Sequence, residues 1–323
     1  MKTALYPLKF QPILKERIWG GNKLKTVFGK STELDNIGES WEISDVEGDT
    51  SIIANGDLAG TTLKECLQLY EADLVGHRNF ERFGYKFPLL IKFIDAQKDL
   101  SIQLHPNDKL AKERHNSFGK TEMWYVMQAD EGANLIVGFN GRIDKEIYLR
   151  HLKKKTLTEI LNYEQVQEGD TYFIEVGRVH AIGAGVMVAE IQQTSDITYR
   201  VYDWDRVDAN GKSRELHTDL AIDAIDFDMT DNYKVAYATQ ENIANTMVEC
   251  PYFTTNYIPV NGKIHKVNKH DSFLIYMCVD GEAEVEFNEA KTLIRKGETV
   301  LIPAAISHFD LVAENAKLLE VYV

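Results

Sequence analysis

The chain of 323 residues is 44% apolar and 27% charged, a composition typical of a soluble globular protein rather than a disordered one. Its length suits two domains, or one domain enlarged by an insertion. The net charge of −14 argues against a general nucleic-acid or anionic-membrane surface, because both need a positive field.

The N-terminal segment 1–21 contains prolines and charged side chains, so it offers neither the apolar core of a signal peptide nor a membrane span. Three cysteines, Cys66, Cys250 and Cys278, are odd in number, far apart and without a C-x-x-C pair. Because such cysteines are typical of free thiols in a reducing compartment, we expect a cytoplasmic protein.

Short strand-like runs dominate the chain, each bounded by Gly, Pro, Asn or Asp. They lie at 88–95, 100–105, 122–127, 134–139, 171–176 and 185–193. Helical patterns interrupt them at 61–70, 106–114, 144–161 and 217–226. In the first of these, a threonine cap precedes one apolar stripe, formed by Leu63, Cys66, Leu67 and Tyr70. The pattern predicts a mainly β protein with a small helical insertion.

A weak internal repeat is the most informative feature of the organisation. Residues 168–180 and 296–308 each contain a glycine, an acid, a threonine and an apolar run, with a histidine eleven positions after the glycine. The upstream segments 124–139 and 274–287 also correspond. Two copies of a unit with this spacing of strands and turns predict cupin-type double jelly-roll barrels.

The strand at 100–105 raises a question, because Ser101, Gln103 and His105 share one face while Ile102 and Leu104 share the other. A strand with one apolar face ordinarily turns its polar face to water. A metal site in the barrel interior would explain a polar face that points inward.

Four candidate metal ligands lie in the first copy of the repeat: Gln103, His105, Glu122 and His180. Two imidazoles, a carboxylate and an amide oxygen suit a borderline divalent cation, zinc most readily, with one position open for substrate or water. The alternative for each histidine alone is an ordinary core or surface residue. Lys120 points the same way as Glu122 on an extended strand, and is either an exposed lysine or an electrostatic or acid–base group.

Arg200 lies among aromatic residues, ten positions after Glu190. An arginine near a metal site can clamp a carboxylate or phosphate, or stabilise a developing enolate. The alternative is an arginine at the surface, stacked on Trp204 or paired with Asp203 or Asp205.

These patterns divide the chain into two predicted domains. Residues 1–235 form an N-terminal metal-binding cupin domain, and residues 236–323 form a C-terminal cupin domain that lacks the metal site. The helical insertions are expected at about 61–84, 106–118 and 144–161. The second copy has Phe273 near the place of Glu122, so we interpret its His308 as structural.

Four ordered motifs match a known family. They are QLHPND (103–108), GKTEMWYV (119–126), GRVHAIGAG (177–185) and EIQQTSDITYRVYDW (190–204). Together they resemble the type I mannose-6-phosphate isomerases in their short bacterial form. The likeness begins near RIWGG (17–21), continues through GESWEIS (38–44) and extends over most of the chain.

The resemblance implies a zinc-dependent aldose–ketose isomerase of cupin fold that interconverts mannose 6-phosphate and fructose 6-phosphate. It implies one Zn²⁺ per chain, with ligands at Gln103, His105, Glu122 and His180. The family's catalytic arginine falls on Arg200 and its pocket lysine on Lys120. Ser101 matches a residue that this family associates with the phosphate.

The mechanism we expect moves a proton between C1 and C2 of the open-chain sugar through a cis-enediolate. Glu190, Lys120 and a zinc-bound water are the candidate bases. Ser101, Lys120 and Arg200 would form a positive island for the phosphate of a small-molecule sugar phosphate, and we expect neither nucleic acid nor membrane as a partner. Two other functions stay open, an iron cupin dioxygenase and a non-catalytic sugar-binding or regulatory cupin. The sequence marks no oligomer interface.

Overall fold

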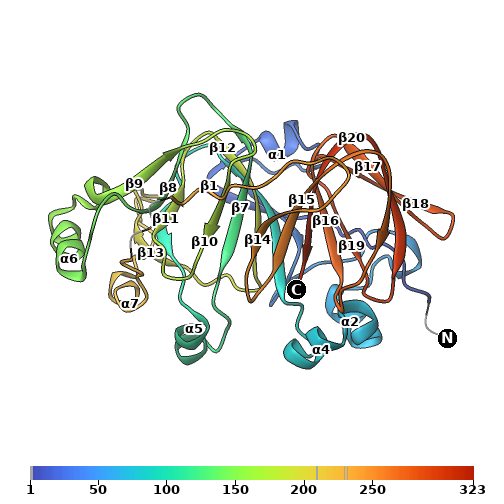
Figure 1. Cartoon of the computed structure of the whole chain (residues 1–323). Helices are drawn as coiled ribbons and strands as arrows, with labels where there is room; N and C mark the ends of the chain where they lie inside the picture. The colour runs from blue at the N-terminus through green and yellow to red at the C-terminus, as the bar shows by residue number, and fades with distance from the viewer. Residues whose placement is uncertain (1–2, 209, 229, 231) are drawn as a thin grey trace.

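The N-terminal part of the chain is a sandwich of two antiparallel sheets (Figure 1). The computed structural model describes residues 3–208, 210–228, 230 and 232–323. The six-stranded sheet has the order β1 (Ile13–Gly21), β2 (Ile37–Ile43), β5 (Leu89–Ala96), β12 (Val186–Gln193), β7 (Glu122–Ala129) and β10 (Thr171–Ile174). The five-stranded sheet has the order β13 (Tyr199–Tyr202), β6 (Ile102–Leu104), β11 (His180–Ile182), β8 (Asn134–Phe139) and β9 (Leu161–Gln165).

The C-terminal part is a third, seven-stranded sheet, curved around its own core. Its path runs β14 (Asn245–Glu249), β15 (Thr254–Val267), β20 (His308–Tyr322), β16 (Leu274–Asp280) and β19 (Thr299–Ile302). The hairpin β17 (Glu282–Phe287) and β18 (Ala290–Arg295) joins this sheet through β20. A short hairpin, β3 (Asp45–Val46) and β4 (Asp49–Thr50), completes the strands of the described residues. The expectation of a mainly β fold is confirmed.

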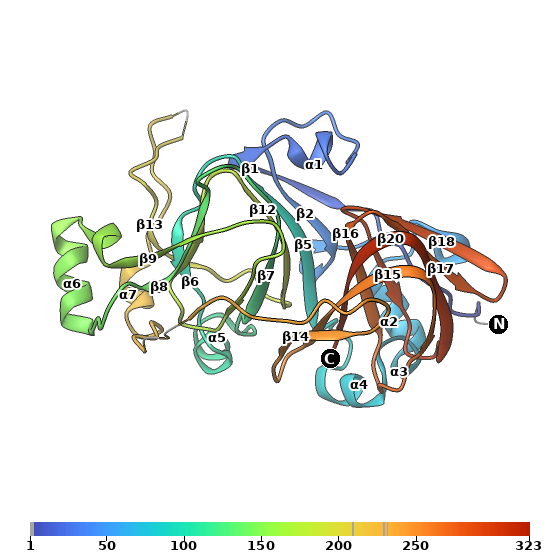
Figure 2. The same ribbon diagram turned by 45° about the horizontal axis from the view of Figure 1, so that its top comes forward.

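Helices occupy the flanks of the sheets. They are α1 (Lys23–Thr26), α2 (Leu63–Tyr70), α3 (Ala72–Val75), α4 (His77–Phe83), α5 (Asp108–His115), α6 (Lys145–Lys154) and α7 (Thr218–Ala221), with 3₁₀ turns η1 (Gly56–Leu58) and η2 (Leu157–Ile160). Figure 2 shows α6 and α7 beside the five-stranded sheet, and α2, α3 and α4 beside the C-terminal strands. Within the described part of the chain, no helix is both long and apolar enough to cross a membrane.

Helix α2 forms as its sequence predicts. The Thr62 hydroxyl accepts from the backbone N–H of Glu65, and the Glu65 carboxylate accepts from the backbone N–H of Thr62, so a capping box fixes the first turn. The buried face is the predicted apolar stripe, Leu63, Cys66, Leu67 and Tyr70. The three cysteines are free, as expected.

The central strands of the six-stranded sheet are buried on both faces. In β7, Met123 and Tyr125 point out of the sandwich, into a core shared with the C-terminal strands. Trp124 and Val126 point the other way, into the core between the two sheets of the sandwich. Strands β5 and β12 alternate in the same way, and every residue of both is buried. Such strands read as nearly continuous apolar runs, so a charged residue within one of them lies inside the protein.

Phe273 is a correction to the comparison of the two repeats. It packs in the shared core with Ile275 and Met277, on the outer face of β16, whereas Glu122 lies at the inner face of β7 with Trp124. Phe273 is therefore not the counterpart of Glu122, because a shift of one residue along a strand exchanges its two faces.

The two parts of the chain are in close contact. Leu8 forms a β-bridge with Leu301, and the Phe87 and Phe273 rings meet with centroids 4.7 Å apart. The backbone N–H of His77 donates to the Asp271 carboxylate. The domain boundary near residue 235 stays a prediction.

We expect Phe273→Ala to lower the free energy of unfolding by about 3–5 kcal/mol, because it leaves a cavity in the shared core that the Phe87 ring cannot fill. Urea denaturation measures this loss. Val267→Ala is the control, since Val267 is 42% exposed and its truncation should cost less than ~0.5 kcal/mol. A loss below ~1 kcal/mol for Phe273→Ala would show that the shared core contributes little.

Candidate active site

The strand at 100–105 turns its polar face inward. Ile102 and Leu104 of β6 are fully buried in the core that lies toward α6 and α7. On the opposite face, Ser101 and His105 are buried and Gln103 is partly buried. The polar residues therefore point between the two sheets, as the metal-site hypothesis requires.

Three of the four predicted metal ligands converge in the sandwich. His105 follows β6, His180 begins β11, and Glu122 begins β7 on the facing sheet. Their ligand atoms all lie within 4.8 Å of one another. His105 Nε2 is 3.5 Å from Glu122 Oε2, and His180 Nε2 is 3.6 Å from Glu122 Oε1. Within the described residues, this is the one group of three or more His, Cys, Asp or Glu side chains gathered closely enough to hold a metal ion.

Backbone carbonyls orient both imidazoles. His105 Nδ1 lies 2.8 Å from the Ile197 carbonyl, and His180 Nδ1 lies 2.8 Å from the Arg178 carbonyl. Each Nδ1 therefore carries the proton and donates it, which leaves the Nε2 lone pair directed at Glu122.

Two of the ligand atoms lack a partner. Glu122 Oε1 and His180 Nε2 are buried, and neither has a hydrogen bond within the described residues. Buried polar atoms are normally satisfied, so two unsatisfied atoms that face each other indicate a missing ligand. Two imidazole nitrogens and a carboxylate are a donor set that suits a divalent transition metal, and the residues therefore fit a bound metal ion.

Lys120 lies against the same atoms. Its ammonium is 3.0 Å from His105 Nε2 and forms an ion pair with Glu122. A cation thus neutralises the buried carboxylate at this point. The His105 Nε2 lone pair that faces Lys120 is the one that a metal ion held by His105 would need.

The electrostatics of the cluster favour neutral histidines. Burial, and next the Lys120 ammonium, lower the pKa of His180 to about 3 and hold the pKa of His105 well below its ordinary value. Both rings are neutral at physiological pH, the form in which imidazole binds metal. Burial and the nearby Glu190 carboxylate raise the pKa of Glu122.

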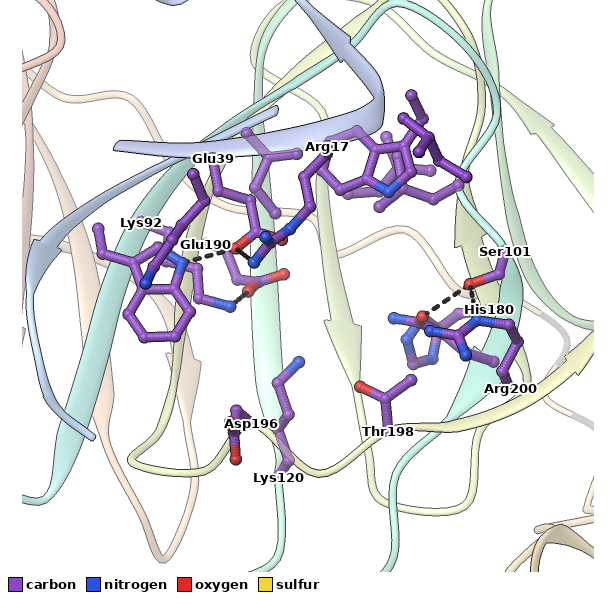
Figure 3. A pocket seen from close by; sticks show the side chains of 18 of the residues that line it. Arg17, Glu39, Lys92, Ser101, Lys120, His180, Glu190, Asp196, Thr198 and Arg200 are labelled. Atoms are coloured by element: carbon purple, nitrogen blue, oxygen red, sulfur yellow. Dashed lines mark hydrogen bonds and ion pairs between the residues drawn. The ribbon is translucent and has the colours of Figure 1, made fainter. Parts of the chain in front are cut away.

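A cavity of about 620 Å³ lies over this cluster (Figure 3). His180, Lys120 and Gln103 line it, together with Glu190 on the six-stranded sheet and Arg200 on the five-stranded sheet. Its volume is within the range of small-molecule sites, and half of the residues that line it are charged. The arrangement suits a small, polar, charged substrate.

Glu190 is held in its ionised form. Its Oε1 lies 3.0 Å from the Lys92 ammonium, and its Oε2 accepts from the indole of Trp124 at 2.9 Å. Burial alone would raise the pKa of Glu190, but Lys92, Lys120 and these hydrogen bonds outweigh it and lower that pKa.

Arg200 and Ser101 lie together on the opposite wall. Arg200 Nε donates to Ser101 Oγ at 3.2 Å, and Arg200 Nη1 donates to the Glu215 carbonyl at 2.9 Å. Figure 3 shows this pair across the cavity from Glu190 and Lys92. Arg200 is thus not a surface arginine, and its guanidinium lines the cavity.

Gln103 is the fourth predicted ligand. Its side-chain oxygen accepts from Ser101 Oγ at 3.3 Å, and its backbone pairs with both His180 and Arg200. Its role as a ligand stays a prediction, as do the catalytic roles of Arg200, Lys120 and Glu190.

Sequence reasoning missed several charged residues of the cavity wall, among them Lys92, Glu39 and Arg17. Glu39 accepts from Arg17 Nε at 3.1 Å, and the Lys92 charge also acts on Glu39. One signal was present in the sequence. Lys92 interrupts the apolar run PLLIKFID, and a lysine in a strand buried on both faces needs a partner inside the protein.

Two family models match the chain. Residues 7–132 match the catalytic domain of type I phosphomannose isomerases, and residues 243–323 match the cupin domain of mannose-6-phosphate isomerases. The chain is 35% identical to the mannose-6-phosphate isomerase ManA of Bacillus subtilis over 94% of its own length and 95% of the relative's. It is 34% identical to the mannose-6-phosphate isomerase of Streptococcus mutans over 94% of each chain.

Solved structures show the same architecture. The crystal structure of the mannose 6-phosphate isomerase from Bacillus subtilis superposes with a TM-score of 0.89 at 32% identity, over 99% of this chain and 100% of that one. The structure of a putative mannosephosphate isomerase from Archaeoglobus fulgidus superposes with a TM-score of 0.79 at 23% identity, over 99% of each chain, and shows the shared fold. The cupin prediction is confirmed.

Proposed function

Because this chain belongs to the type I mannose-6-phosphate isomerases, an aldose–ketose isomerase family, we propose that its cavity interconverts mannose 6-phosphate and fructose 6-phosphate with one bound zinc ion. The observation that carries the proposal is the buried His105, Glu122 and His180 cluster beside a cavity that both cationic and acidic side chains line. In this proposal Gln103 is the candidate for a fourth ligand.

The proposed metal supplies a Lewis acid that stabilises negative charge on the sugar oxygens. The side chains of the protein hold the proposed ligands in position and bind the substrate. Carbonyl-bound Nδ1 atoms hold His105 and His180 in the tautomer that presents Nε2. If His105 Nε2 held a cation, the Lys120 ammonium would give up its contact with that nitrogen and could turn to the substrate.

Isomerisation moves a proton between C1 and C2 through a cis-enediolate. Glu190 is our proton acceptor, since it is ionised, buried and on the cavity wall. Arg200, on the opposite wall, places positive charge where the enediolate develops. Ser101, Lys120 and Arg200 form the positive island for the phosphate.

We expect Glu190→Gln to lower kcat about 100-fold with no change in metal content, because the amide cannot accept the proton. Steady-state kinetics and deuterium incorporation from heavy water into the product measure the effect. Glu16→Gln is the control, since Glu16 is an exposed carboxylate on the same cavity and kcat should change less than about twofold. Full deuterium exchange in Glu190→Gln would assign the proton transfer to another group.

A coupled assay tests the function itself. The purified protein, loaded with zinc, should form fructose 6-phosphate from mannose 6-phosphate. Folded, zinc-loaded protein without turnover would support a non-catalytic cupin, and oxygen consumption by iron-loaded protein would support a dioxygenase.

A further inference from the structure

The segment after β13 gathers arginines around one buried carboxylate. Asp203 accepts from Arg214 Nε at 2.7 Å and from Arg214 Nη2 at 2.5 Å, so the two side chains form a bidentate pair. Asp203 also accepts from Arg206 Nη2 at 2.6 Å. Arg200 lies three residues before Asp203 and donates to the carbonyl of Glu215, next to Arg214.

Arg206 and Arg214, the two arginines that pair with Asp203, point in different directions. Arg214 lines the cavity, whereas Arg206 does not and instead donates to the Asp99 carbonyl at 2.6 Å. Arg214 uses Nε and Nη2 on Asp203, and its Nη1 donates to no atom of the described residues. The Arg214 side chain is 30% exposed and lines the cavity, and its pair with Asp203 holds the guanidinium in place.

The rest of the cavity is close to electrically balanced. Its other cations each have an acidic partner, in the pairs Lys15–Asp49, Arg17–Glu39, Lys92–Glu190 and Lys120–Glu122. In Figure 3, Asp196 lies on the Lys120 side of Thr198, away from Arg200.

The region around Arg200 carries an excess of positive charge. Its guanidiniums are those of Arg200, Arg206 and Arg214, and the nearby carboxylates are the buried Asp203 and the exposed Glu215. Burial and, next, the like charge of Arg214 lower the pKa of Arg200. A dianion placed between Arg200 and Arg214 would offset their like charges.

We propose that Arg214 is a phosphate ligand that works with Arg200 and Ser101, and that Asp203 is the residue that positions it. The inference rests on the proposed function and adds to it the residue that selects phosphorylated sugars. A guanidinium locked by a bidentate carboxylate loses little entropy on binding, and its free Nη1 can donate a charge-assisted hydrogen bond to a phosphate oxygen. The phosphate of the sugar then lies at Arg214, and C1 and C2 lie between Arg200 and Glu190.

The test compares Arg214→Ala with Arg206→Ala, two arginines that share Asp203 but differ in facing the cavity. We expect Arg214→Ala to raise KM for mannose 6-phosphate about 30-fold and to leave kcat within about threefold, since it removes a charge-assisted hydrogen bond to the ground state and the transition state alike. The Kd for inorganic phosphate, measured by calorimetry, should rise by a similar factor. Arg206→Ala should leave both constants within about threefold.

The positioning role has its own readout. Asp203→Asn should raise KM when Arg214 is present and have no further effect on KM in the Arg214→Ala background, because it acts through Arg214. Equal effects of Arg214→Ala and Arg206→Ala on KM, or an unchanged Kd for phosphate in Arg214→Ala, would overturn the proposal and leave Arg214 a structural clamp. Phosphate binding is measured without turnover, so a failure of the isomerase function is distinguishable from a failure of the phosphate site.

Discussion

Glu122→Gln is expected to lower kcat/KM about 1000-fold and to abolish stoichiometric metal binding. The amide keeps the size of the buried side chain but removes the negative charge that lies between the two imidazoles. Loss of the metal removes several kcal/mol of charge stabilisation in the transition state, and each 1.36 kcal/mol is tenfold in rate. Elemental analysis of the purified variant, with the coupled assay, measures both effects.

Glu131→Gln serves as its control, since Glu131 is an exposed carboxylate in the turn between β7 and β8. Metal content and activity should match those of the unsubstituted protein. A Glu122→Gln variant that keeps full activity without metal would contradict the proposed role of the cluster.

Arg200→Ala is expected to lower kcat by about 100-fold to 1000-fold while the metal content stays at one ion per chain. The guanidinium lies on the wall opposite Glu190 and donates to Ser101 rather than to any of the three clustered residues. In the proposed function it stabilises developing charge, and it is not one of the proposed metal ligands. Losses of this size are typical when one preorganised donor to a developing oxyanion is removed.

The same preparation should be assayed for metal, kcat and KM. Arg200→Lys keeps the positive charge but loses the planar set of guanidinium donors. Its kcat should therefore lie between those of Arg200→Ala and the unsubstituted protein. Parallel loss of metal and activity in Arg200→Ala would mean that Arg200 supports the structure of the site instead.

Much of the metal cluster was predictable from the sequence because strand geometry is periodic. Ser101, Gln103 and His105 stand two residues apart, which fixes them on one face whatever the tertiary structure. His180 was found through the internal repeat, and it does begin a strand, as His308 does in the second copy. The two histidines differ in burial, since His180 is 1% exposed whereas His308 is exposed.

The other charged residues of the cavity could not be predicted, because they meet through contacts between distant segments of the chain. Lys92 and Glu190 meet through the pairing of β5 with β12, which no local pattern specifies. Arg214 lines the cavity and pairs with Asp203, and a charged loop in sequence gives no sign of either contact. The error at Phe273 has a simple origin, because a repeat aligned one residue out of register exchanges the inner and outer faces.

The most direct test of the account is anomalous diffraction at the zinc edge from crystals of the active, purified protein. We predict one peak per chain, within bonding distance of His105 Nε2, His180 Nε2 and a Glu122 carboxylate oxygen. A fully active crystal with no peak there, or with its zinc bound elsewhere, would contradict the account.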